Sequence, residues 1–343
     1  MKAVVIREHG DLDVLRFEDV PDPEPECDEV IVGVRAVALN HLDLWARKGV
    51  PGFRFPLPMV AGCDSAGVVE AVGSRVEGVA VGDEVVVAPG TSCGRCRACL
   101  DGRDHHCPDY AIFGEHRDGA LREKFRVPRE NVMPKPPELS FEQAACIPIP
   151  FLTAWHMVVH RAEVRPGETV LVQAAGSGVG VAAVQIAKMF GAKVIATAGS
   201  DRKLERAAEL GADHGIQYRE QDVAGEVKAL TGGKGVEVVL DHVGTDTWEA
   251  SLRSLAWQGR LVTCGATSGT KASIHLNHLF FKSLSVLGST MGSRGDLIDI
   301  LAHHAAGRLR TVIAETLPWT EIQEAHRRLE SREVFGKVVV TLG

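Results

Sequence analysis

Four cysteines lie in one short stretch, SCGRCRACLDGRDHHC, which spans residues 92–107. They are Cys93, Cys96, Cys99 and Cys107, with the spacing C-x2-C-x2-C-x7-C. In a reducing compartment, a compact set of thiols binds a metal more often than it forms disulfides. The spacing therefore predicts a metal site, and a loop of free thiols is the less favoured alternative.

A second motif that could do chemistry is the turn AAGSGVG, residues 174–180. It follows a predicted strand, ETVLVQA (168–174), and opens a predicted helix, GVGVAAVQIAKMFG (178–191). A helix start offers unpaired N–H groups and a positive dipole end to a pyrophosphate, and small residues let the phosphate approach. The strand–turn–helix context predicts a dinucleotide site. The residues expected to bind it are Ala175, Ser177, Gly178, Val179 and Gly180.

The next predicted strand, AKVIATA (192–198), bears on the choice of cofactor. Sites for NAD usually carry an acidic residue at the end of this strand, and here that position is Ala198. Ser200, Arg202 and Lys203 follow, and a hydroxyl with two cations suits a 2′-phosphate. Asp201 could instead serve the ribose. We expect NADP(H) to be favoured over NAD(H).

The elements around these motifs follow two patterns. Residues 1–150 hold many short valine-rich runs bounded by Gly, Pro and Asp, which predict a β-rich barrel or sandwich. From about residue 168, strands alternate with helices, which predicts a parallel sheet covered on both faces. The buried face of the first of these helices is predicted to contain Val179, Ala182, Ala183, Ile186 and Phe190.

Bulk properties exclude several classes of protein. A chain of 343 residues suits about two domains. The net charge of −7 gives no general attraction to nucleic acid or to an anionic membrane. The start of the chain has no apolar signal region, and no run is long enough to span a bilayer. We expect a cytoplasmic protein.

Taken together, these motifs resemble the medium-chain dehydrogenase/reductase family, which includes zinc alcohol dehydrogenases and quinone oxidoreductases. The resemblance covers essentially the full length and implies an α/β protein. A GroES-like β-rich catalytic domain (1–150) would be followed by a Rossmann domain with a doubly wound parallel sheet (151–291). Residues 292–343 would return to the catalytic domain. The resemblance also implies one structural zinc per chain in the lobe at 92–108, which agrees with four thiolates closing a tetrahedral shell.

Alcohol dehydrogenases of this family bind a second, catalytic zinc. The three positions that match its ligands are Asn40, Cys63 and Ile149. A neutral amide is a poor zinc ligand and an alkyl group is none. A rearranged site using His41, Cys63 and Asp64 is the less favoured alternative. A catalytic zinc needs three positioned ligands, so all three of these residues would have to bind it.

The stretches NHLD (40–43) and FLTAW (151–155) resemble the zinc-free quinone oxidoreductase branch more closely. This resemblance implies that Asn40 and Asp43 flank the nicotinamide and that Thr153 touches it. It matches Lys203 and Tyr218 to a 2′-phosphate site. The other residues that it matches to cofactor contacts are Val243, Gly244, Gly265, Ala266 and Lys337.

The leading hypothesis is hydride transfer between NADP(H) and a carbonyl, quinone or activated alkene, without catalytic zinc. One alternative is an alcohol dehydrogenase with altered metal ligation, and another is a non-catalytic NADPH-binding structural or regulatory protein. The candidate catalytic residues are Asn40, His41, Asp43, Cys63 and Asp64. In the family the last Rossmann strand, here near 284–290, commonly pairs with its two-fold mate. We expect a homodimer or homotetramer acting on a small molecule.

Overall fold

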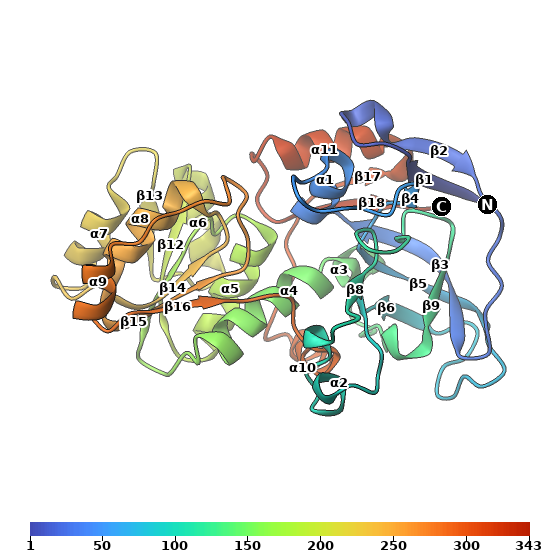
Figure 1. Ribbon diagram of the computed structural model, residues 1–343, viewed down its shortest axis with the longest axis horizontal. Helices are drawn as coiled ribbons and strands as arrows, with labels where there is room; N and C mark the ends of the chain where they lie inside the picture. The colour runs from blue at the N-terminus through green and yellow to red at the C-terminus, as the bar shows by residue number, and fades with distance from the viewer. The chain divides into compact units, whose positions relative to one another are not determined.

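A computed structural model describes the whole chain, residues 1–343, as two compact units (Figure 1). The first unit consists of Met1–Ile149 and Ser293–Gly343, and the second of Pro150–Gly292. None of the helices combines the length and the apolar character that crossing a bilayer requires.

The first unit is built on a seven-stranded sheet with the order β10-β6-β5-β3-β18-β17, in which β9 also pairs with β3. Its valine-rich strands share one core, as the sequence pattern indicates, and Val30, Val32 and Val340 are among its buried members. The strands of this sheet are β3 (Glu29–Ala38), β5 (Asp64–Val72), β6 (Glu84–Val87), β9 (Lys124–Pro128), β10 (Val132–Pro134), β17 (Ile313–Pro318) and β18 (Lys337–Thr341).

Two smaller sheets complete this unit. One has the order β2-β1-β4, with β1 (Lys2–Ile6), β2 (Arg16–Asp19) and β4 (Met59–Val60), and the other pairs β7 (Gly90–Thr91) with β8 (Ala111–Ile112). The helices are α1 (His41–Lys48), α2 (Arg97–Leu100), α3 (Phe141–Ala145), α10 (Arg294–Ala305) and α11 (Ile322–Glu330), with short 3-10 turns η1 (Leu12–Val14), η2 (Asp104–His106), η3 (Arg129–Asn131) and η5 (Trp319–Glu321).

The second unit is a six-stranded sheet in which every pair is parallel, with the order β13-β12-β11-β14-β15-β16. Helix α5 packs on β11 and β12, α6 on β12 and β13, and α8 on β14 and β15 (Figure 1). Strand residues such as Val170, Leu171 and Val172 are fully buried, as in other parallel sheets that helices cover. This is the doubly wound fold that the alternating pattern predicts.

The strands of this unit are β11 (Thr169–Val172), β12 (Lys193–Ala198), β13 (His214–Gln217), β14 (Val236–Asp241), β15 (Leu255–Thr263) and β16 (Ser285–Gly288). Its helices are α5 (Gly178–Met189), α6 (Asp201–Glu209), α7 (Val223–Leu230), α8 (Thr245–Ser254) and α9 (Leu276–Phe281). The chain enters it through α4 (Pro148–Trp155) and a π-helical turn, η4 (His156–Arg161).

Helix α5 is more buried than its sequence pattern predicts. Ala182, Ala183 and Ile186 are buried as expected, but Val179 and Phe190 are only half-buried. Residues on its other sides, such as Val181, are also buried. The helix contacts η4 as well as the sheet, so neighbours surround it on more than one side and a single buried face does not describe it.

Candidate active site and cofactor site

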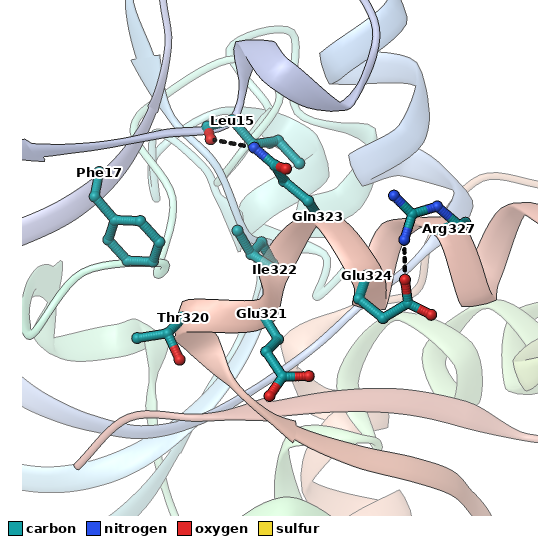
Figure 2. Close-up of a pocket in the computed structure, with 8 residues that line it drawn as sticks. All are labelled: Leu15, Phe17, Thr320, Glu321, Ile322, Gln323, Glu324 and Arg327. Atoms are coloured by element: carbon teal, nitrogen blue, oxygen red, sulfur yellow. Dashed lines mark hydrogen bonds and ion pairs between the residues drawn. The ribbon is translucent and has the colours of Figure 1, made fainter.

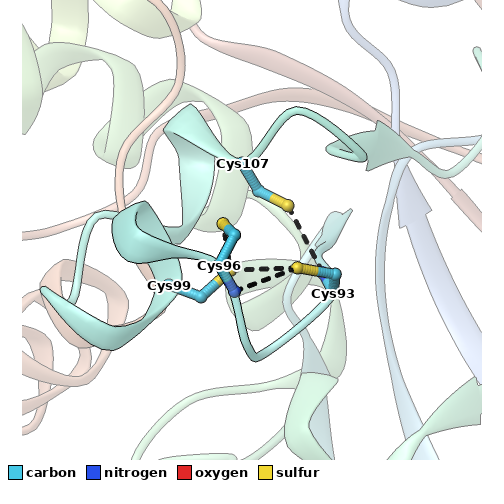
Figure 3. A group of neighbouring side chains, drawn as sticks. All are labelled: Cys93, Cys96, Cys99 and Cys107. Atoms are coloured by element: carbon cyan, nitrogen blue, oxygen red, sulfur yellow. Dashed lines mark hydrogen bonds between the residues drawn. The ribbon is translucent and has the colours of Figure 1, made fainter.

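The four cysteines of the 92–108 lobe converge on one point (Figure 3). Their sulfur atoms all lie within 4.8 Å of one another. The Sγ atoms of Cys96 and Cys99 are 3.5 Å apart, and those of Cys93 and Cys99 are 4.0 Å apart. These spacings bracket the edge of about 3.8 Å that Zn–S bonds of about 2.3 Å give a tetrahedron. The donor set therefore fits zinc and leaves no open position for a substrate.

Backbone groups prepare these sulfurs for a cation. The Cys96 N–H donates to Cys93 Sγ at 3.3 Å, and the N–H groups of Cys93 and Asp109 donate to Cys107 Sγ at 3.4 and 3.3 Å. Hydrogen bonds from the backbone of Arg95 and Cys96 lower the pKa of Cys93 to about 6, whereas, in spite of its backbone donors, burial and the neighbouring thiols raise the pKa of Cys107 to about 11. Donors of this kind favour the thiolate, which is the form that binds metal.

A partly buried ion pair joins the lobe to a distant part of the chain. The Arg294 backbone N–H donates to Asp104 Oδ1 at 3.0 Å, and its guanidinium Nε lies 3.3 Å from Asp104 Oδ2. Arg294 also donates to Ser92 Oγ at 3.2 Å. The lobe is thus anchored at the start of α10, which fits a structural role.

The candidate catalytic residues meet where the central strand β3 ends. Asn40 is the N-cap of α1, two residues after that strand. Asp64 begins β5 and pairs with Ala38, while Lys337 begins β18, whose Val339 pairs with Ala38 from the other side. Because β5 and β18 both run antiparallel to β3, their first residues lie at the same end of the sheet.

Hydrogen bonds join these residues into one polar cluster. Asn40 Nδ2 donates to Asp64 Oδ2 at 2.9 Å, and the Asn40 backbone N–H donates to Asp43 Oδ2 at 2.7 Å. The Cys63 thiol donates to Asp43 Oδ1 at 3.5 Å. Lys337 Nζ donates to Asn40 Oδ1 at 2.5 Å and lies 3.6 Å from Asp64 Oδ2. Four of the five predicted catalytic residues are thus brought together.

Burial sets the protonation of this cluster. It raises the pKa of Asp64 to about 6, against the opposing effect of the Lys337 charge. Burial also raises the pKa of Asp43, and it raises that of the Cys63 thiol well above its ordinary range. The cluster therefore retains protons at pH values where exposed carboxyl groups have lost them.

The other two predicted residues of this region are His41 and Lys337. His41, the fifth predicted catalytic residue, is the first residue of α1 and is half-buried. Lys337, matched to a cofactor contact by the resemblance, is almost fully buried, and its ammonium group also donates to the Leu39 carbonyl at 2.6 Å. Within the first unit, Lys337 supplies the positive charge of the polar cluster.

Glu115 is a group beside this cluster that sequence reasoning missed. Burial, and then the nearby Asp43 charge, raise its pKa to about 7. The segment that carries it packs on the cluster, because a Cβ added to Gly114 would lie 3.1 Å from Cys63 Sγ. Glu115 is distant from these residues in the chain and shares no motif with them, so no signal in the sequence singles it out.

The cofactor turn is shaped as its motif predicts. Ser177 is the N-cap of α5, and its Oγ accepts the Gly180 N–H at 2.9 Å. A Cβ on Gly180 would lie 2.4 Å from the Ala174 carbonyl, so only glycine fits there. The N–H groups of Gly178 and Val179, in the first turn, have no intrahelical acceptor. They are available to a pyrophosphate, and Ala175 is buried beneath them in the turn.

The end of β12 gathers groups suited to a phosphate. Ser200 is the N-cap of α6, and its side chain makes no capping hydrogen bond. A Cβ added to the preceding Gly199 would lie 2.8 Å from Tyr218 Oη and 3.1 Å from Arg219 Nε. Asp201 accepts from Gln217 Nε2 at 3.0 Å. Arg219 was missed, although its position next to Tyr218 is a signal that could have found it.

Four further predicted cofactor residues, in two pairs, follow the carboxyl ends of the neighbouring strands β14 and β15, where ligands of such sheets bind. A Cβ on Gly244 would lie 3.0 Å from the Ala266 Cα atom, and one on Gly265 would lie 3.1 Å from the His242 carbonyl. Val243 accepts a hydrogen bond from the Ser268 N–H at 2.8 Å. Arg202 is exposed, Lys203 is half-buried, and Thr153 is buried in α4.

A shallow pocket lies elsewhere in the first unit, beside α11 (Figure 2). It contains none of the predicted site residues. Its lining consists of Leu15, Phe17, Thr320, Glu321, Ile322, Gln323, Glu324 and Arg327.

Comparison with known proteins agrees with this geometry. The alcohol dehydrogenase GroES-like domain family matches residues 26–137, and the zinc-binding dehydrogenase family matches residues 178–306. A quinone oxidoreductase of Salmonella typhimurium is 33% identical over 97% of both chains. An acryloyl-coenzyme A reductase of Sulfurisphaera tokodaii is 31% identical over 99% of both chains.

Among solved structures, one named NAD-dependent alcohol dehydrogenase shares 53% identity over the whole of both chains, with a TM-score of 0.97. The fold and these relatives define an NAD(P)-dependent oxidoreductase. The chain belongs to the medium-chain dehydrogenase/reductase family, with its GroES-like and Rossmann domains.

Proposed function

We propose that this protein transfers hydride between NADP(H) and a carbonyl, a quinone or an activated alkene, without a catalytic metal. The observation that carries this proposal is the place of Lys337, whose ammonium group lies 2.5 Å from Asn40 Oδ1 and 3.6 Å from Asp64 Oδ2. A positive charge is thus already supplied where the related alcohol dehydrogenases bind zinc. Polarised substrates need less Lewis-acid help than unactivated alcohols.

The polar cluster suits the proton that accompanies hydride transfer. Reduction of a carbonyl or an alkene needs one proton for each hydride, delivered by a group whose pKa lies near the working pH. Glu115, with its pKa raised to about 7, and Asp64, with its pKa raised to about 6, meet that requirement. Asn40 and Asp43 position the cluster through their hydrogen bonds.

Oxidation of an alcohol with NAD is the second candidate. The solved structure that shares 53% identity is named an NAD-dependent alcohol dehydrogenase, and this favours that activity. The names of the relatives cited above favour reduction of quinones or of activated alkenes instead. A non-catalytic role is less favoured, because hydrogen bonds join the polar residues predicted to be catalytic into one cluster.

A substrate screen under chelation separates these functions. We expect NADPH oxidation with quinones and enones to continue after chelator treatment at a temperature where the protein stays folded. Asp43→Asn should lower kcat about 10- to 100-fold, because a charge-assisted hydrogen bond is lost. Asp299→Asn, at an exposed position on α10, is the control and should be silent. Alcohol oxidation that chelation abolishes would favour the second candidate.

The preference for NADP(H) is carried by Ser200, Lys203, Tyr218 and Arg219 at the end of β12. We expect NADPH to bind more tightly than NADH. Lys203→Ala and Arg219→Ala should each weaken NADPH about tenfold and leave NADH unchanged, because one cationic contact is lost. Ala198→Asp should shift the preference towards NADH.

Fluorescence titration of both dinucleotides measures this preference. Lys193→Ala is the matched control, because Lys193 is exposed at the opposite end of the same strand. Equal affinities in the native protein would mean that Asp201 or a backbone group governs the ribose.

The assembly of the protein stays a proposal. β16 is an edge strand of the six-stranded sheet and pairs only with β15. An unpaired edge of this kind supports pairing with a second copy of the chain.

A further inference from the structure

His242 contacts the cofactor turn through Ser177, although no sequence motif indicates this residue. It follows Asp241, the last residue of β14, and is almost fully buried. Its Nε2 atom lies 2.7 Å from Ser177 Oγ. Burial lowers the pKa of His242, against the smaller opposing effects of Asp241 and of the Ala174 backbone.

The direction of this hydrogen bond follows from the other partner of Ser177. The Ser177 Oγ atom accepts the Gly180 N–H at 2.9 Å, so the hydroxyl proton is free to point at His242 Nε2. Burial lowers the pKa of His242, which keeps the ring neutral near pH 7 and leaves Nε2 able to accept. The ring therefore holds the end of the turn 174–177 through Ser177.

The turn needs this support because its backbone is unusual. Ala174 adopts a φ of 47°, in the left-handed region that residues with a Cβ atom disfavour. The Ala174 N–H is held by Thr197 Oγ1 at 3.0 Å, and its carbonyl accepts the Ser177 N–H at 3.0 Å. Loss of the His242–Ser177 hydrogen bond would make the turn 174–177 less rigid, and this turn directs the first N–H groups of α5.

We propose that His242 is a positioning residue for the cofactor pyrophosphate. It holds Ser177 so that the N–H groups of Gly178 and Val179 stay directed at one site. The inference rests on the proposed function only in that the cofactor is a dinucleotide. It does not depend on the substrate or on the choice between NADPH and NADH.

The test is dinucleotide binding by His242→Phe, which keeps a ring but removes the hydrogen bond to Ser177. We expect NADPH and NADH to be weakened by the same factor, about tenfold. The KM for the cofactor should rise while kcat at saturation stays unchanged. His242→Gln, which offers an acceptor and a donor close together, should recover most of the affinity. His214→Phe, at an exposed position on β13, is the matched control.

A double-mutant cycle with Ser177→Ala separates this role from a purely structural one. We expect His242→Phe to have little further effect once Ser177 is alanine. Additive losses, or a folded His242→Phe variant that binds both dinucleotides like the native protein, would overturn the proposal. If that variant does not fold, His242→Gln is compared with His242→Asn, and equal native affinity in both overturns it. A loss confined to NADPH would instead concern the 2′-phosphate site, and would overturn the proposal too.

Discussion

Native protein should carry one zinc per chain, and replacing a ligand should release it. In Cys96→Ser, we expect zinc affinity to fall by at least about 100-fold, because even loss of a group that only supports a ligand costs 10- to 100-fold. The melting temperature should fall as well, since binding to a structural site contributes directly to folding. Elemental analysis of desalted protein and a thermal melt measure the two effects.

The control is Cys27→Ser, because Cys27 is half-buried and lies outside the cluster. It should change neither the zinc content nor the melting temperature. Hydride transfer by Cys96→Ser, assayed where it is folded, should be close to native, since the four-thiolate shell has no position for a substrate. Two zincs per chain would support the alcohol dehydrogenase with altered ligation, and none would contradict the assignment of the lobe.

Acid should weaken the protein through His326, because this histidine is buried in neutral form and must take up a proton when the chain unfolds. Its Nδ1 atom lies 3.5 Å from Nη1 of Arg47, itself fully buried, and Arg47 Nη2 is paired with Glu330. Burial, and then the Arg47 charge, lower the pKa of His326 to about 3 from 6.5. His304, also buried, has its pKa lowered to about 4.

The direction in which stability changes with pH follows from proton uptake on unfolding. Between pH 6.5 and their folded pKa values, His326 and His304 bind more protons in the unfolded chain than in the folded one, so the stability that they contribute is present above about pH 6.5 and is lost as the pH falls. Asp64 and Glu115, with raised pKa values, have the opposite sign, so the contribution of His326 is read from its variant. For His326 alone the loss between pH 7 and pH 5 is about 2 kcal/mol. Urea unfolding at each pH measures it, with the slope m checked for constancy.

His326→Gln keeps an acceptor for Arg47 but does not titrate. We expect its stability to depend on pH less steeply than that of the native protein over this range. His214→Gln, at an exposed position, is the control and should follow the native curve. Parallel curves for His326→Gln and the native protein would show that this histidine does not contribute.

Sequence reasoning was sufficient where the chemistry is local. The four cysteines occupy one loop, and their spacing alone predicts that the sulfurs converge. The turn 174–180 likewise lies in a single strand–turn–helix segment, so its place between β11 and α5 follows from neighbouring residues. The alternation of strands and helices predicts the parallel sheet for the same reason.

Local patterns of this kind do not predict the polar cluster. The resemblance pointed to Asn40, Asp43, Cys63 and Asp64, but nothing local shows that they touch. Their contacts, and that of Lys337, depend on how β5 and β18 pair with β3. A shift of one residue in the pairing of β5 or β18 would turn Asp64 or Lys337 to the other face of the sheet.

Thus the sequence by itself determined the cysteine cluster and the strand–turn–helix segment, because each depends on residues close together in the chain, and its resemblance over the full length indicated the family. Only the tertiary structure decided the partner of Lys337, the nearness of Glu115 to Asp43, and the contact between His242 and Ser177. The physical reason is that these contacts join residues far apart in the chain, and the pairing of strands, rather than any periodicity, sets which of them meet.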